Sequence, residues 1–186
     1  MYFTKLIQGT LALCVFNLPI AAAEATINFE GTPKLQKDSL NWTIWGEKSP
    51  ITEVTIRQSL EEMAAAANNR DIDRLLGFYS PNYSGEVTIT TATGPETIQV
   101  TREESRERLQ LSYQTTEKYN FSYSLQEITI SNDGKTAKVI GTSNEDFNLQ
   151  GQDYRSTSAW VINFELIDGK ILIVSDTSTL LDLEEL

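Results

Sequence analysis

The order of hydrophobic patterns between residues 51 and 181 constrains the fold more than any other feature. Apolar residues first recur at helical spacing, then alternate in a strand pair, return to helical spacing and finally alternate through four more strands. Helices gathered on one face of an antiparallel sheet share a single core with it. The order therefore predicts an α+β fold in which three N-terminal helices pack on a strongly curved antiparallel sheet. Such an arrangement is a cone-shaped α+β barrel with a pocket inside.

The helices are predicted from apolar stripes and from capping residues. Ser49-Pro50 is typical of a helix start, because a hydroxyl caps well and proline suits the first helical position. Asp71 can cap a second, short helix, whose apolar stripe ends at Tyr79. Residues 101–104 form a capping box, which predicts a third helix extending to about Lys118.

The strands are predicted from alternation of apolar and polar residues. Residues 87–91 and 98–100 both alternate and flank a Gly-Pro turn, so we expect a hairpin there. In the next strand the apolar set changes parity between Leu125 and Ile128, which would turn half of it outward. We therefore predict a β-bulge near residues 126–127.

Residues 1–23 have the features of a secretory leader. Lys5 precedes an apolar stretch, and Ala21-Ala22-Ala23 supplies the small residues that a signal peptidase requires. A membrane anchor is the alternative, but polar residues and a proline interrupt a stretch that would need about 20 apolar residues. We expect an exported protein, periplasmic or extracellular, with an extended arm over residues 24–50 and one domain over residues 51–186.

The arm contains two large rings, Trp42 and Trp45, in an otherwise polar and irregular segment. Rings of this size usually pack against another surface. The sequence leaves open whether the arm docks on its own domain or on a partner.

The composition excludes several classes of function. The chain has 26 acidic and 15 basic residues and a formal net charge of −11, which repels nucleic acids and anionic membranes. It has no histidine, and its one cysteine, Cys14, lies within the predicted leader. A serine–histidine triad, a histidine-based metal site and a thiol nucleophile in the mature protein are therefore excluded. We expect no cofactor, no metal, no nucleic-acid partner and no stable membrane association after the leader is removed.

Three segments carry a resemblance to a known superfamily: residues 69–76, residues 133–139 and residues 168–173. In their order and spacing, the chain from about 51 to 181 resembles the nuclear transport factor 2-like superfamily, which shares the cystatin-like cone, and in particular its SnoaL-like group. That superfamily includes isomerases, dehydratases, epoxide hydrolases, polyketide cyclases and members without known activity. The resemblance therefore implies the fold and leaves the function open.

The catalytic residues of these enzymes transfer poorly to this chain. The steroid isomerases use a tyrosine for which the predicted first helix has no counterpart, and the cyclases and scytalone-type dehydratases depend on histidine. The epoxide hydrolases use an Asp-Arg-Asp set, whose residue types Asp146, Arg155 and Asp176 can supply.

Two acidic residues are the candidate catalytic groups. Glu145 alternates with apolar residues of its strand, which predicts that its carboxylate faces the pocket, where loss of water favours the protonated form. Alternatively, it lies near the strand end and is solvated. Asp176 shares a strand face with apolar residues in a Ser/Thr-rich stretch, and it either faces the pocket or pairs with an arginine across an oligomer contact.

Four further residues are candidates for ligand binding. Tyr113 offers a phenolic donor, and Trp160 and Phe164 offer rings that can stack on a flat ligand, although all three also suit a core. Arg155 can fork onto a carboxylate in the pocket or form a surface salt bridge.

Together these features favour non-catalytic binding of a small apolar or amphipathic molecule, or of a protein partner, in a cone pocket. The sheet has one strand that is apolar on both faces, so a homodimer through the sheet is also expected. The alternative is a small lyase, isomerase or hydrolase in which a pocket carboxylate transfers a proton.

Overall fold

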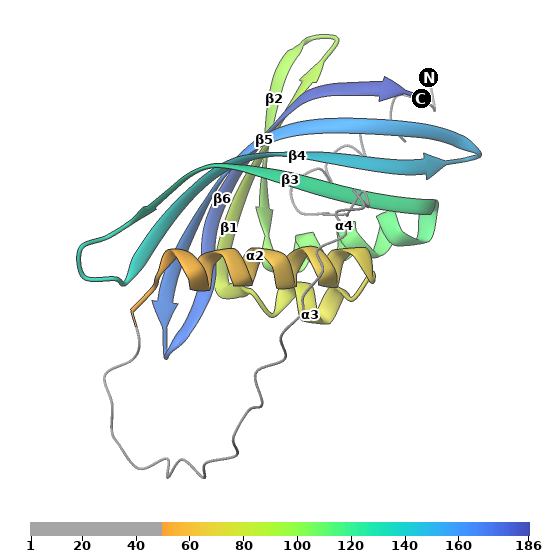
Figure 1. The fold of residues 1–186 in the computed structure, drawn as a ribbon. Coiled ribbons are helices and arrows are strands. Elements are labelled where there is room, and N and C mark those ends of the chain that lie inside the picture. The colour runs from red at the N-terminus through yellow and green to blue at the C-terminus, as the bar shows by residue number, and fades with distance from the viewer. Residues whose placement is uncertain (1–49) are drawn as a thin grey trace, which may run out of the picture.

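The computed structural model describes residues 50–186 (Figure 1). The predicted leader and nearly all of the predicted arm, with Trp42 and Trp45, lie outside the described residues. The described chain contains the following elements in order: α2 (Glu53–Asn68), α3 (Ile72–Leu76), β1 (Tyr79–Thr91), β2 (Gly94–Thr101), α4 (Arg102–Thr115), β3 (Thr116–Ile130), β4 (Thr136–Leu149), β5 (Gln152–Ile167) and β6 (Lys170–Glu185). This is an α+β fold with one six-stranded sheet.

Capping residues set where the helices begin. Thr101 and Glu104 form the predicted capping box of α4, and the Asp71 carboxylate accepts the Arg74 N–H at the start of α3. The first helix begins later than predicted, because Thr52 and Thr55 form a capping box of their own. A threonine pair carries a weaker sequence signal than a Ser-Pro dipeptide.

The helix predicted to end at Tyr79 is shorter in the structure. Gly77 follows α3, and its N–H bonds back to the carbonyl groups of Asp73 and Arg74. Tyr79 therefore begins β1 instead of completing a helical stripe. Its spacing from Leu75 and Leu76 fits a helix, but the glycine ends the helix first.

The sheet has the strand order β2-β1-β6-β5-β4-β3. Four of the five pairings are antiparallel, but β1 and β6 run parallel, so the predicted fully antiparallel sheet is wrong for this pair. Alternation along a strand carries no information about its direction, which is why the sequence missed this pairing. The predicted hairpin of β1 and β2 and the predicted bulge of β3 are both present, the latter as a register shift between Leu125 and Glu127.

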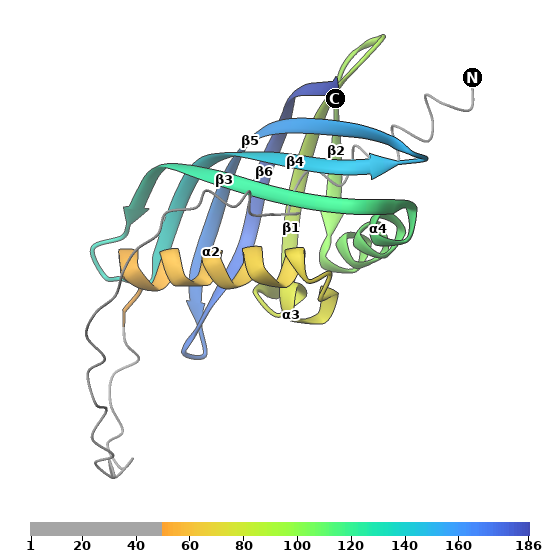
Figure 2. The ribbon, with the colours of Figure 1, turned by 45° about the vertical axis from the view of Figure 1, so that its right-hand side comes forward.

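All three described helices lie on one side of the bent sheet (Figures 1 and 2). We call this side the concave face. Buried residues of α2 and of the strands belong to one core cluster, which includes Ile56, Leu60, Met63, Val139, Ile162, Phe164 and Ile173. No helix within residues 50–186 combines the length and the apolar character needed to cross a bilayer.

Candidate functional site

The concave face has an apolar half and a polar half. The apolar half belongs to the core cluster that includes α2. The polar half carries six buried polar side chains of β4, β5 and β6, which are mostly small: Ser143, Glu145, Ser156, Ser158, Asp176 and Ser178. The register brings members of this set side by side, with Ser143 opposite Ser158 and Glu145 opposite Ser156. Buried carboxylates are unusual enough to mark this half as the candidate site.

Asp176 is more deeply buried than Glu145, with 1% of its surface exposed. The Tyr83 hydroxyl donates a hydrogen bond to Asp176 Oδ1, and Tyr83 also bonds to Ser105 of α4. The second oxygen, Oδ2, is buried and has no hydrogen-bond partner among the described residues. Burial raises the pKa of the Asp176 carboxyl to about 7, and the Tyr83 hydrogen bond only partly opposes that rise.

The two tyrosines beside Asp176 are kept in their neutral form. Burial, followed by the nearby Asp176 carboxylate, raises the pKa of Tyr83 well above its usual range. The pKa of Tyr79 is also raised, first by burial and then by Tyr83. The two rings meet edge to face with centroids 4.6 Å apart. Tyr83 therefore keeps its proton and acts as a hydrogen-bond donor to Asp176.

Gly85 provides the space in which the Tyr83–Asp176 pair sits. It lies directly opposite Asp176 in the β1–β6 register. A Cβ at this position would stand 2.5 Å from Asp176 Oδ1 and 2.9 Å from Tyr83 Cζ, closer than real atoms approach. The missing side chain therefore allows the carboxyl and the phenol to meet.

Glu145 is also buried, with 4% of its surface exposed, and its neighbours in the register are Phe121 and Ser156. The charge of Glu145 acts on Tyr113 of α4. Burial is the main reason that the pKa of the Tyr113 phenol is raised, and the negative charge of Glu145 is the second. The Tyr113 hydroxyl donates to the Ala67 carbonyl at 3.2 Å. The predicted residues Glu145 and Tyr113 are therefore close enough to interact.

The two predicted acids do not form one catalytic pair. Their neighbours on β5 are Ser156 for Glu145 and Ile162 for Asp176, six residues apart. Six residues of a strand span about 20 Å. Each acid therefore has its own surroundings, and Trp160 lies between them on the same face of β5.

Trp160 and Phe164 have different neighbours. Trp160 lies opposite Gly141 and Ser178, and its indole crosses Gly141 so closely that a Cβ there would overlap Cζ2 and Cη2. It belongs to the stretch between the two acids. Phe164 is fully buried opposite Ala137 and Ile173, so it lies in the apolar half.

Arg155 lies on the opposite side of the sheet from the other candidates. Its guanidinium binds the Asp146 carboxylate through two bonds, with Nε to Oδ1 at 2.6 Å and Nη2 to Oδ2 at 2.9 Å, and its side chain is 42% exposed. Asp146 and Arg155 thus pair with each other, while Asp176 is on the concave face. The Asp-Arg-Asp set considered from the sequence is not assembled in this structure.

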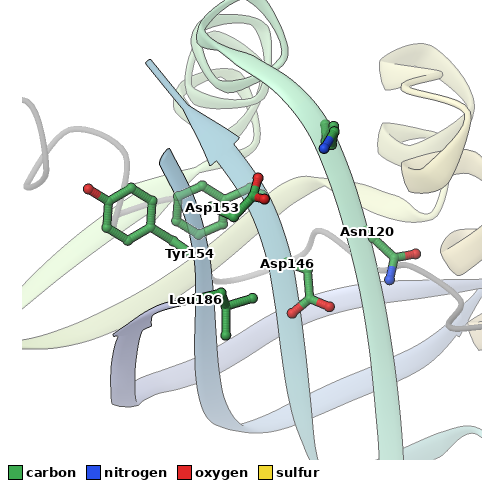
Figure 3. A pocket seen from close by; sticks show the side chains of 7 residues that line it. Asn120, Asp146, Asp153, Tyr154 and Leu186 are labelled. Carbon is green, nitrogen blue, oxygen red and sulfur yellow. The ribbon is translucent and has the colours of Figure 1, made fainter. Parts of the chain in front are cut away.

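A hollow of about 200 Å³ lies where β3 begins, β4 ends and β5 begins (Figure 3). We call it the strand-end hollow. Its lining residues are Lys118, Asn120, Asp146, Phe147, Asp153, Tyr154 and Leu186. Neither Glu145 nor Asp176 lines it, so it is a second place of interest.

Sequence reasoning found both buried acids but not their immediate surroundings. Tyr83 is one of seven tyrosines, and its residue type alone does not distinguish it. The available signal was the alternation of Tyr83, Gly85, Val87 and Ile89, which places all four on one face of β1. Within residues 50–186 no three Asp, Glu, Cys or His side chains gather as a metal site would require.

Comparisons by sequence and by structure give different results. No family model and no curated protein matches the sequence. Many solved structures match the fold. A ketosteroid isomerase-like protein from Erwinia carotovora atroseptica is 12% identical, with a TM-score of 0.55, over 69% of this chain and 95% of that one. A conserved protein from Planctomyces limnophilus is 13% identical, with a TM-score of 0.57, over 72% and 97%.

A third similar structure is hexachlorocyclohexane dehydrochlorinase LinA-type3 from Novosphingobium barchaimii. It is 13% identical, with a TM-score of 0.51, over 72% of this chain and 91% of that one. Identities this low establish a shared fold and no shared activity. The described chain thus has the fold of the nuclear transport factor 2-like superfamily and its SnoaL-like members.

Proposed function

We propose that this protein is an exported binding protein whose concave face forms a cone pocket for a small apolar or amphipathic molecule. The observation that carries the proposal is Asp176 Oδ2, which is buried without a hydrogen-bond partner among the described residues. A buried polar atom left unsatisfied costs about 1–3 kcal/mol. A ligand group that bonds to this oxygen offsets that cost.

The surroundings of Asp176 suit a ligand with a large apolar part. Trp160 supplies a ring, and Gly85, Ser158 and Ser178 are small residues of the same buried face. Small side chains around one large ring and one polar anchor are typical of ligand sites. Glu145 supplies a further polar group on this face, and Tyr113 of α4 interacts with its charge.

The test is native mass spectrometry of the processed protein purified from its own source. The unmodified protein should retain a small molecule, and Asp176→Asn should retain much less of it. Asp182→Asn removes the same charge from an exposed position of the same strand, so this control should retain it fully. If the unmodified protein carries no small molecule and none raises its melting temperature, the proposal is wrong.

The second candidate function is proton transfer by Asp176. The pKa of about 7 favours it, because a carboxyl that titrates near neutral pH can both accept and donate a proton. Tyr83 would then stabilise the ionised form during the reaction. A lyase or isomerase of this kind would lose its turnover in Asp176→Asn, with a rate that rises through pH 7 in the unmodified protein if Asp176 is the base.

We also infer that two copies associate through the outer face of the sheet. One row of that face is uncharged, with Thr88, Thr179, Ala159 and Thr142 side by side in the register. An uncharged row on a chain of net charge −11 suits contact with a second copy. Light scattering should give twice the monomer mass, and Ala159→Glu should restore the monomer mass. A monomer at all concentrations would refute this inference.

A further inference from the structure

β3 is the last strand of the sheet, and among the described residues only β4 pairs with it. A free strand edge presents N–H and C=O groups to which another strand can add, so proteins usually guard it with charges, a proline or a very short strand. β3 has 15 residues, and its stretch Asn120–Leu125 contains no charged residue, glycine or proline. β2, at the other edge of the sheet, is shorter and carries Pro95 and Glu96. β3 is therefore the edge at which a further strand would add.

Side chains along this edge are only partly covered. Tyr123 and Leu125 lie on the concave face, and both are half-buried. A hollow of about 100 Å³ lies between the start of α2 and the β3 bulge, and its lining includes Arg57 and Leu125. A strand added to β3 would place its own side chains next to Tyr123 and Leu125 and over this hollow.

The predicted arm joins the domain at the end of this edge. Ile51 N–H donates a hydrogen bond to the Gly134 carbonyl at 2.7 Å, in the turn that joins β3 to β4. Pro50 contacts the same glycine, since a Cβ added to Gly134 would stand 2.4 Å from Pro50 Cβ. Residues 24–49 of the arm lie outside the described residues. The chain therefore enters the domain just beyond Ile130, the last residue of β3.

Residues 40–45 of the arm can reach the uncharged stretch of β3. Counting back from this end, Trp45 is five residues before Pro50, and Leu125 is five residues before Ile130. Five residues of extended chain span about 17 Å in both segments. Trp45 can therefore come level with Leu125, with the arm running parallel to β3. Because the two segments belong to one chain, their effective concentration is high.

The arm segment has the composition that a strand at this edge requires. Residues 40–45 are Leu-Asn-Trp-Thr-Ile-Trp, uncharged like the stretch of β3 that they would meet. The last four are aromatic or β-branched, which favours a strand. In this alignment Trp45 falls beside Leu125 and the hollow, and Thr43 falls beside Tyr123. Pairs of a β-branched and an aromatic residue are favourable between neighbouring strands.

The charges that flank the two uncharged stretches are complementary. The same alignment brings Lys37 level with Glu117 and Asp38 level with Lys118. Glu117 and Lys118 are exposed, and neither forms a salt bridge with another described residue. Both pairs join opposite charges, so this parallel register is favoured over one shifted along the strand.

We propose that residues 40–45 add to β3 as a parallel seventh strand, so that the arm docks on its own domain. Backbone hydrogen bonds to the free edge hold the added strand, and the two flanking charge pairs select its register. Trp45 covers Leu125 on the concave face, and Trp42 lies on the outer face, which is also proposed to meet a second copy. The docked arm is separate from the ligand proposed at Asp176, which lies three strands away on β6.

The first test follows deuterium exchange of the β3 backbone amides by NMR in the processed protein. In Thr43→Pro, the amides of residues 120–125 that point away from β4 should exchange at least about tenfold faster than in the unmodified protein, because proline removes a donor from the middle of the added strand. Thr32→Pro changes the same residue type in the arm outside the proposed strand, so this control should not alter the exchange.

Equal exchange in Thr43→Pro and the unmodified protein would show that the arm is not docked at β3. Slow exchange that depends on protein concentration and survives Thr43→Pro would place a second copy on this edge, and it would refute the proposal equally.

The second test exchanges charges to check the register. Lys118→Glu should speed the exchange of the same amides by about two- to fivefold, because it sets a like charge level with Asp38 and exposed pairs are weak. Asp38→Lys in the same chain should restore the slow exchange of the unmodified protein. Lys170→Glu, at an exposed position of β6, is the matched control and should have no effect. If the double variant exchanges as fast as Lys118→Glu, the proposed register is wrong.

Discussion

Replacing Asp176 by asparagine should change the pH dependence of stability more than any other single substitution of an acidic residue. The pKa of this carboxyl is raised from 3.8 to about 7 by burial in the folded state, whereas the unfolded chain exposes it to water. The difference is about three units, which corresponds to about 4 kcal/mol in the free energy of unfolding.

The direction of the effect follows from proton binding. Below about pH 4 both states carry the protonated carboxyl, so Asp176 adds no pH dependence there. Between about pH 4 and pH 7 the folded state holds a proton that the unfolded state has lost, so stability falls as the pH rises. Above pH 7 both states are ionised, and the folded state bears the whole cost of the buried charge.

The assay is urea denaturation at pH 4, 5.5, 7 and 8.5, followed by circular dichroism. Asp176→Asn should have about the stability of the unmodified protein at pH 4 and should exceed it by up to about 4 kcal/mol at pH 8.5. Asp182→Asn, on the exposed part of β6, should follow the unmodified protein throughout. If Asp176→Asn and the unmodified protein show parallel curves of stability against pH, the pKa of the Asp176 carboxyl is not raised in the folded state.

Two further substitutions test the supports of the site. Gly85→Ala should cost about 1–3 kcal/mol in the free energy of unfolding, because its Cβ would overlap the Tyr83–Asp176 pair, and the neighbouring exposed Ser84→Ala should cost much less. Equal midpoints in urea would contradict this. Arg70→Lys should also destabilise by about 1–3 kcal/mol, since the guanidinium donates to the carbonyl groups of Tyr113 and Thr116 at 2.8 and 3.1 Å and to that of Glu117 at 3.1 Å. A lysine that restores full stability would show that charge alone suffices.

The sequence predicted what depends on periodicity and local capping. The three described helices, the six strands, the capping box at Thr101 and the bulge near Glu127 all follow from patterns within a few residues of one another. Burial of Glu145 and Asp176 also followed from alternation. The direction of β6 relative to β1 did not, because pairing direction depends on contacts between segments far apart in the chain.

The candidate site was predictable only one strand at a time. Alternation places Asp176 on the concave face but does not say which residue of β1 meets it, and Gly85 and Tyr83 reach it through a parallel pairing that no local pattern reveals. In the same way, Arg155 was a candidate for the pocket by residue type. It stands at an odd position of β5 and Trp160 at an even one, so its side chain lies on the other side of the sheet, where it pairs with Asp146.

The energetics of Asp176 bear on its role more directly than its position does. At neutral pH the chain keeps a carboxyl that weakens its own fold, with one oxygen unsatisfied, in a setting where asparagine or serine would cost less. Gly85 leaves space for this carboxyl, and the Tyr83 hydroxyl donates a hydrogen bond to it. Neither removes the free-energy cost of burying its charge. Stability alone gives no reason for such an arrangement, since the neighbouring buried positions are serines that fold without a charge. A buried carboxyl that lowers the free energy of unfolding, where a neutral residue would not, is best explained by a ligand that it contacts. A ligand should therefore first be sought at Asp176, and not at the equally buried Phe164.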